Sequence, residues 1–291
     1  MEEYLSEYEN YLKRENLSAN TLENYKRDVK LFMEYIISKN LDIKDVTEQW
    51  GNRYVIELKN SKKSLNTIKR NISSLKKFYS FLVTKGEVNI NPFIIKTVGS
   101  SKRIDIKYLT YDEIEKLIDA PDENTVKGIR DKAMIEIMYG TGIKVTELIN
   151  LKLDNINLKD HFLLFNKSEE ERFIPIGRYC VNIMKKYLSY RKELDKFQSE
   201  YVFLNVKGEP LTRQGFWKII KEYAKEINID KEINCTVLRH SFAMHLLENG
   251  ADISVVQELL GLTYLNSAEV YKSAIKNRKI VDEYIKNHPR A

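Results

Sequence analysis

Basic side chains are concentrated in one short stretch of the N-terminal third of the chain. This stretch, called here the basic stripe, holds seven cations and no Asp or Glu: Lys62, Lys63, Lys69, Arg70, Lys76, Lys77 and Lys85. The basic pairs recur every seven residues, so in a helix they share one side. Like charges one or two turns apart repel each other, which an anionic partner would relieve. The first six therefore predict a surface that binds nucleic-acid phosphates, with a lysine-rich solvated face as the alternative.

Composition narrows the class of protein further. The chain has 291 residues, a hydrophobic content of 43% and a net charge of +6, which predicts folded domains rather than disorder. Cys180 and Cys235 are the two cysteines, too few for a disulfide framework or a cysteine-rich zinc site, and no HExxH motif occurs. No secretory signal and no apolar run of about 18 residues is visible. We expect a soluble, cytoplasmic protein without a metal site.

The N-terminal part is expected to be helical throughout. A capped helix is predicted from Leu22 to Ile37, and a second one, which carries the basic stripe, from Ser64 to Thr84, ending before Gly86. The apolar positions of the second helix are spaced three and four residues apart, as in a helix packed along its length. They are Leu65, Ile68, Ile72, Leu75, Tyr79 and Leu82.

The segment from Asn89 to Ile106, which contains Pro92, Gly99, Ser100 and Ser101 and shows no sustained periodicity, separates this part from the rest and is interpreted as a linker. A new helix is predicted at Thr110, where the capping-box pattern occurs. Two short apolar runs, Phe162–Phe165 and Arg172–Ile174, predict a small antiparallel hairpin. Further helices are expected near 178–195, 212–227, 236–249, 253–260, 265–273 and 277–286. The expected fold class is mainly α with one small β-hairpin.

Four segments of the C-terminal half carry a family resemblance. They are Asp131–Leu148 with its Thr141-Gly142-Ile143-Lys144, Val237–Leu247 with its Arg239-His240, Leu259-Leu260-Gly261 followed ten residues later by Tyr271, and the end of the chain, Asn287–Ala291. In this order they resemble the boxes of the tyrosine recombinase (phage integrase) family, and the last resembles the terminus of Xer-type site-specific recombinases. The resemblance covers essentially the whole chain.

The resemblance implies a domain organisation and a reaction. It implies an N-terminal four-helix, SAM-like core-binding domain over 1–88 that clamps DNA, a linker over 89–108, and a helical catalytic domain over 109–291. In the family a tyrosine attacks a phosphodiester of double-stranded DNA and forms a 3′-phosphotyrosyl bond, which another strand's hydroxyl can reverse. No cofactor, ATP or metal is needed, because the covalent link conserves the bond energy.

Residue by residue, the resemblance implies three catalytic positions and three departures. Tyr271 matches the nucleophile, Arg239 the second catalytic arginine, and Lys167 in the hairpin the lysine that protonates the leaving 5′-oxygen. The departures each remove a side chain that the family pattern contains: Lys144 stands for Arg, Thr236 for His, and Leu262 for His or Trp. Lysine keeps the charge but not the bidentate fork, and leucine offers no hydrogen bond.

These departures leave two functions open. One is a recombinase with impaired catalysis, and the alternative is a non-cleaving DNA-binding paralogue that acts as a partner or regulator. His240 and His245 could compensate for the missing histidine, although capping or packing is the simpler role for them.

The end of the chain suggests a protein partner. Ile280, Val281, Tyr284 and Ile285 form an apolar stripe that predicts either docking on another copy or a related recombinase on DNA, or packing on its own domain.

Overall fold

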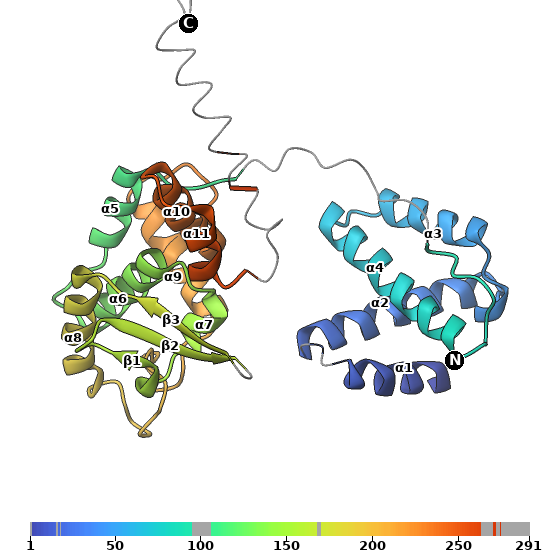
Figure 1. Cartoon of the computed structure of the whole chain (residues 1–291), viewed down its shortest axis with the longest axis horizontal. Helices are drawn as coiled ribbons and strands as arrows, with labels where there is room; N and C mark the ends of the chain where they lie inside the picture. Colours follow the sequence, from blue (N-terminus) through green and yellow to red (C-terminus); the bar gives the residue numbers. More distant parts are fainter. Residues whose placement is uncertain are drawn as a thin grey trace, which may run out of the picture. The chain divides into compact units, whose positions relative to one another are not determined.

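Apolar side chains collect in separate cores in the two halves of the chain, and each core belongs to one unit. The computed structural model describes residues 2–15, 17, 19–94, 106–167, 170–262, 270, 271 and 274. Its chain divides into the units Met1–Lys102 and Arg103–Ala291 (Figure 1). Of the described helices, none is both long and apolar enough to cross a membrane.

Four helices build the first unit, as predicted. They are α1 (Glu2–Arg14), α2 (Ala19–Ser38), α3 (Glu48–Asn60) and α4 (Leu65–Thr84), with a short 3₁₀ turn, η1 (Ile43–Asp45), before α3. Helix α4 packs against the other three. The aromatic rings at the centre meet edge to face, with the Phe32 and Tyr54 ring centroids 4.9 Å apart, so this small core gains from quadrupole contacts as well as from burial.

The boundaries of α4 follow from local side-chain chemistry. Ser64 precedes the helix, and its hydroxyl accepts a hydrogen bond from the backbone N–H of Thr67, which satisfies one of the free donors of the first turn. The helix ends before Gly86, as predicted. Of the predicted apolar stripe, Ile68, Leu75, Tyr79 and Leu82 are buried and Ile72 is partly buried, but Leu65 is 51% exposed, because the first residue of α4 lies beyond the end of the core.

The second unit contains seven described helices and one sheet. Its helices are α5 (Tyr111–Asp119), α6 (Val126–Thr141), α7 (Val145–Ile149), α8 (Arg178–Arg191), α9 (Arg213–Glu226), α10 (Cys235–Glu248) and α11 (Ile253–Leu260), and a 3₁₀ turn, η2 (Leu153–Asn155), precedes the sheet. Helix α6 runs between α8 and α10 (Figure 1), and most of its residues are buried. The capping box predicted at Thr110 is present at the start of α5, and both cysteines are buried and unpaired.

The predicted hairpin is confirmed and is part of a three-stranded antiparallel sheet. The strands are β1 (Ile156–Asn157), β2 (Phe162–Lys167) and β3 (Glu170–Pro175), in the order β1-β2-β3. The short β1 was not predicted. Leu163 pairs with Ile174 in the register, and both are buried, so one face of the hairpin packs on the core and the other faces solvent.

Several predictions fall on residues that the structure does not describe. The helices expected near 265–273 and 277–286 lie outside the described residues, apart from 270, 271 and 274. The apolar positions Ile280, Val281, Tyr284 and Ile285 lie there too, and so does most of the predicted linker, 95–105.

Candidate active site and nucleic-acid interface

Helix α10 carries the arginine at the centre of the candidate site. Asn234 caps the helix by accepting hydrogen bonds from the backbone N–H groups of Thr236 and Val237. This cap fixes where the helix begins and therefore which side chains turn inward. Arg239 lies one turn further on and is only 8% exposed.

The Arg239 guanidinium is held by the ends of two helices. Its Nη1 donates to the carbonyl of Gly142 at 2.6 Å, and its Nη2 donates to the carbonyl of Leu260 at 2.5 Å. Gly142 ends α6 and Gly261 ends α11, both in the left-handed conformation with φ of 61° and 58°. The last carbonyls of a helix lack intrahelical partners and carry the negative end of its dipole, so both helix ends attract the cation.

This arrangement positions Arg239 without neutralising it. Carbonyl dipoles carry no net charge, and within the described residues only two of the five guanidinium N–H donors are used. Burial lowers the pKa of Arg239, the carboxylate of Glu147 and the phenol of Tyr271 oppose this, and the Arg172 cation adds to the lowering. The remaining donors can serve an anion that enters the site.

Tyr271 is buried close to this arginine. It is 6% exposed and belongs to an apolar cluster with Phe242 and Leu260. The ring of His240 meets it edge-on, with the centroids 5.6 Å apart and the planes at 77°. Burial raises the pKa of the Tyr271 phenol, and the charge of Arg239 lowers it in part. The phenol is therefore neutral at physiological pH, and its charged neighbour is Arg239.

Lys167 is the last residue of β2 and pairs in the register with Glu170 of β3. Its backbone thus lies at the end of the hairpin, where the sequence placed it. The side chain of Lys167 is outside the part of the chain that the structure describes.

The three departures from the family pattern occupy different environments. Lys144 is the exposed N-cap of α7, and its backbone N–H donates to Glu147 Oε2 at 2.7 Å. Thr236 is exposed in the first turn of α10. Leu262 is half-buried in the same apolar cluster as Tyr271. At position 262, apolar packing thus stands where the family pattern has a hydrogen-bonding side chain.

Arg172 is a site residue that the sequence analysis missed. It lies on β3 opposite Phe165, and its Nη2 is 3.0 Å from Glu147 Oε2. A signal was available: Arg172 and the buried Ile174 are two residues apart, so they share one face of the strand. A charged residue on the core-facing side of a strand has to find a polar partner.

The two histidines take different places. His245 is buried, stacks on Tyr111 with the centroids 3.9 Å apart, and exchanges a 3.0 Å hydrogen bond with the Tyr139 hydroxyl through Nδ1. The expectation of a packing role is confirmed for His245. His240 contacts Tyr271 instead, so it is the histidine near the candidate nucleophile.

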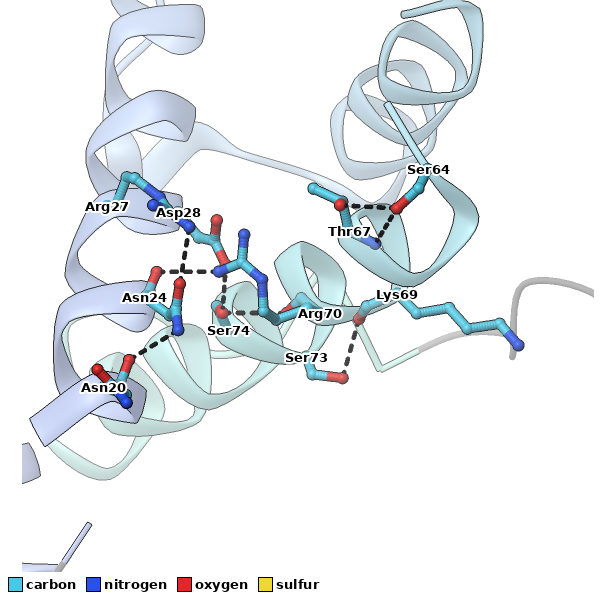
Figure 2. A network of polar contacts seen from close by, with 10 residues as sticks. All are labelled: Asn20, Asn24, Arg27, Asp28, Ser64, Thr67, Lys69, Arg70, Ser73 and Ser74. Atoms are coloured by element: carbon cyan, nitrogen blue, oxygen red, sulfur yellow. Dashed lines mark hydrogen bonds and ion pairs between the residues drawn. The ribbon is translucent and has the colours of Figure 1, made fainter. Parts of the chain in front are cut away.

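Part of the basic stripe is paired inside the first unit, which corrects the expectation of seven cations without counter-charge. Arg70 Nη1 lies 2.5 Å from Asp28 Oδ2, and the Ser74 hydroxyl donates to the same oxygen at 2.8 Å. Asp28 belongs to α2 and is 1% exposed. Figure 2 shows Arg70 turned toward Asp28, while Lys69 points away from this network. The pair connects α2 to α4, and it neutralises Arg70.

Two further lysines of the basic stripe have acid partners on α1 or beside it. Lys77 Nζ is 2.6 Å from Glu15, and Lys85 pairs with Glu7 and, at 3.5 Å, with Glu87. The partners Glu7 and Glu15 cannot be read from the local sequence.

The other four cations form the exposed part of the basic stripe. Within the described part of the first unit, no ion pair involves this group, Lys62, Lys63, Lys69 and Lys76, and all four are exposed. Lys69 and Lys76 are seven residues apart on one face of α4. This group is the part of the predicted phosphate-binding surface that keeps its charge.

Comparison with known proteins covers both units. Residues 107–278 match the phage integrase family, and residues 5–86 match the phage integrase N-terminal SAM-like domain. The chain is 40% identical over 282 residues to the tyrosine recombinase XerD of Listeria monocytogenes serotype 4b (strain F2365), with 94% of each chain covered. It is 35% identical over 301 residues to the XerD of Staphylococcus aureus (strain Mu50 / ATCC 700699), with both chains covered completely.

A solved structure shares the fold. The XerH site-specific recombinase bound to a palindromic difH substrate, in a post-cleavage complex, superposes with a TM-score of 0.79 at 24% identity, covering 92% of this chain and 80% of that one. The fold of this chain is therefore the same as that of a protein whose structure was solved in complex with DNA.

Proposed function

The chain belongs to the phage integrase family and is a tyrosine recombinase of the Xer type, and from this premise we propose that it cleaves and rejoins duplex DNA at specific sites through Tyr271. The single observation that carries the proposal is the meeting of Tyr271 and Arg239 in one buried site, with Arg239 fixed by two helix ends and still charged. A buried cation that has no carboxylate partner among the described residues suits an anionic substrate.

The proposed reaction uses these groups in a simple order. The phenol oxygen of Tyr271 attacks the scissile phosphorus, a P–O bond to tyrosine forms, and the bond to the 5′-oxygen breaks. The guanidinium of Arg239 stabilises the charge that develops on the non-bridging oxygens. Because burial raises the pKa of Tyr271, its proton has to pass to a water molecule as the P–O bond forms. A proton has to reach the departing 5′-oxygen, and Lys167 is the proposed donor.

Reduced turnover follows chiefly from the departures at Thr236 and Leu262. Each preorganised donor that is absent costs about 2.7–4 kcal/mol, or roughly 10²–10³ in rate. Leu262 packs in the apolar cluster with Tyr271, so it cannot supply a donor there, and Thr236 cannot carry a proton as imidazole does. We propose slow cleavage for this chain.

A non-cleaving role remains the second candidate. The apolar packing of Leu262 favours it, because a site that binds the phosphate but leaves its oxygens unstabilised would hold DNA without cutting. In that role the chain would be a partner or regulator in a complex with a related recombinase.

Double-stranded DNA is the proposed partner in both cases. The phosphate contacts come from Lys62, Lys63, Lys69 and Lys76, while Arg70 and Lys77 serve mainly to join the helices of the first unit. We also propose self-association, or association with a related recombinase on DNA, through the C-terminal segment with Ile280 and Tyr284. Because the proposed substrate is double-stranded DNA, we propose that the protein is located in the cytoplasm.

The test is covalent capture on a nicked duplex, which loses a short strand fragment on cleavage and so traps the linked protein. Wild type should give a slowly accumulating protein–DNA adduct, and Tyr271→Phe should give none. If DNA is bound but no adduct forms on any substrate, the non-cleaving role replaces the recombinase proposal.

A further inference from the structure

We propose that Arg172 supplies a second guanidinium, beside that of Arg239, to the site that binds the DNA phosphate. In this role it replaces the arginine that the family pattern has at position 144, and Glu147 is the residue that positions it. The catalytic role of Arg172 in this inference rests on the proposed function. The physical content of the inference, an oxyanion site between Arg172 and Arg239, can be tested without cleavage.

Strand β3 fixes the direction of Arg172. The residue pairs with Phe165 in the register, and its guanidinium carbon lies 5.3 Å from the centroid of the Phe165 ring. Stacking of a guanidinium on an aromatic face restricts the planar fork while leaving its edges open. The side chain is 19% exposed, which is low for an arginine on a small sheet.

Glu147 ties Arg172 to position 144. One carboxylate oxygen, Oε2, accepts from Arg172 Nη2 at 3.0 Å and from the backbone N–H of Lys144 at 2.7 Å. The guanidinium of Arg172 is therefore held at the N-terminal end of α7, beside the residue that replaces the family's arginine. The planar guanidinium of Arg172 on β3 can therefore take the place of the guanidinium that is lost when lysine stands at position 144.

The end of α11 connects Arg172 to Arg239. A Cβ atom added to Gly261 would lie 2.0 Å from Arg172 Nη1, so the side chain lies directly against this glycine. The residue before it, Leu260, holds Arg239 through its carbonyl. The two guanidinium groups thus approach one helix end, Arg239 from α10 and Arg172 from the sheet.

One feature of this pair points to an anionic ligand. Burial is the largest cause that lowers the pKa of Arg239, Glu147 opposes it, and the Arg172 charge adds a smaller lowering. The Arg172 Nε is buried and has no hydrogen-bond partner among the described residues. An unpaired buried donor is costly, and a phosphate oxygen is an acceptor that would satisfy it.

The first test is binding of inorganic phosphate to the full chain, measured by isothermal titration at low ionic strength. Arg172→Lys keeps the charge and removes the fork, and we expect about tenfold weaker phosphate binding. Arg178→Lys is the matched control, an exposed arginine of the same unit, and should bind as wild type does. Equal phosphate affinity in Arg172→Lys and wild type would overturn the inference, whatever the cleavage assay shows.

The second test is the nicked-duplex assay as a double-mutant cycle. Arg172→Lys should lower the rate of adduct formation roughly 10²-fold. Lys144→Arg should change wild type by less than about threefold, yet should raise the Arg172→Lys variant at least tenfold, because coupled residues are not additive. An adduct rate that is insensitive to Arg172→Lys overturns the inference and leaves the recombinase proposal standing.

The two tests separate the two proposals. Phosphate binding that depends on Arg172 in a protein that forms no adduct would support the inference and sink the cleavage proposal. Should Arg172→Lys fail to fold by circular dichroism, Phe165→Leu serves instead. It removes the ring on which the guanidinium stacks and keeps both the arginine and the net charge, and it should weaken phosphate binding in the same direction; no change in Phe165→Leu would overturn the inference.

Discussion

Arg70 in the first unit and Arg239 in the second are both positioned cations, and they are held in opposite ways. Arg70 is paired with the buried carboxylate of Asp28, which cancels its charge. Arg239 is held by the carbonyls of Gly142 and Leu260, which orient it and leave its charge in place. At Arg70 the buried carboxylate makes the cation part of the fold, whereas at Arg239 the helix-end carbonyls leave the cation available to an anion.

The largest expected effect is at Arg239. Replacing it by lysine removes the fork that spans two helix ends, and adduct formation should fall roughly 10²–10³-fold. Arg239→Ala should in addition lower the free energy of unfolding by about 1–3 kcal/mol, because two buried carbonyls lose their donors. Chemical denaturation alongside the adduct assay separates the two effects. A fully active Arg239→Lys variant would contradict the view that Arg239, unlike Arg70, is held in place to bind the phosphate.

A gain of function is expected at Thr236. This exposed position one turn before Arg239 has room for a larger side chain, and Thr236→His should raise the adduct rate about 10²-fold if one donor is restored. Leu262→His should add less, because it removes apolar packing from the cluster that holds Tyr271. Any added product has to disappear with Tyr271→Phe. A folded Thr236→His no faster than wild type would show that histidine at 236 does not reach the pocket.

At Asp28 the expected effect is on stability rather than on chemistry. Asp28→Ala leaves Arg70 and Ser74 without their shared acceptor, and we expect a loss of about 1–3 kcal/mol in the free energy of unfolding. Glu15→Ala, at the exposed pair with Lys77, is the matched control and should cost much less. Urea denaturation measures both. Equal losses in the two variants would contradict the structural role given to Asp28.

The smallest expected effect concerns the salt dependence of DNA binding. Lys69→Gln with Lys76→Gln removes two cations that have no ion pair within the described part of the first unit, so the slope of log K against log salt should flatten by about 1.8. Lys77→Gln should change the slope less than Lys69→Gln or Lys76→Gln alone, since Glu15 already neutralises Lys77. Binding titrations between 50 and 200 mM salt give the slopes. If Lys77→Gln matched Lys69→Gln, the division of the basic stripe would be wrong.

The helices could be predicted from sequence wherever a long apolar period and a cap coincide. The α4 helix followed from the spacing of Ile68, Leu75 and Leu82 and from Ser64, because both signals are local. The two-residue strand β1 has no such signal, since its pairing partner on β2 decides its structure.

The site was predictable in its residue types but not in its connections. Motif order indicated Arg239 and Tyr271, yet nothing local shows that Gly142 and Leu260 hold the guanidinium. Arg172 was hidden inside an apolar run, where only strand alternation marks it. The acids that pair with Arg70 and Lys77 come from other helices, so the charge of the basic stripe could not be balanced from its own sequence.

The central claim is that Tyr271, beside a charged Arg239, forms the covalent link to DNA. Peptide mapping of the trapped adduct by mass spectrometry tests it most directly, because a phosphotyrosyl nucleotide marks one residue. We predict a nucleotide-linked peptide with the modification on Tyr271, absent from Tyr271→Phe and strongly reduced in Arg239→Lys. A link at another residue, or an adduct that survives Tyr271→Phe, would contradict the account.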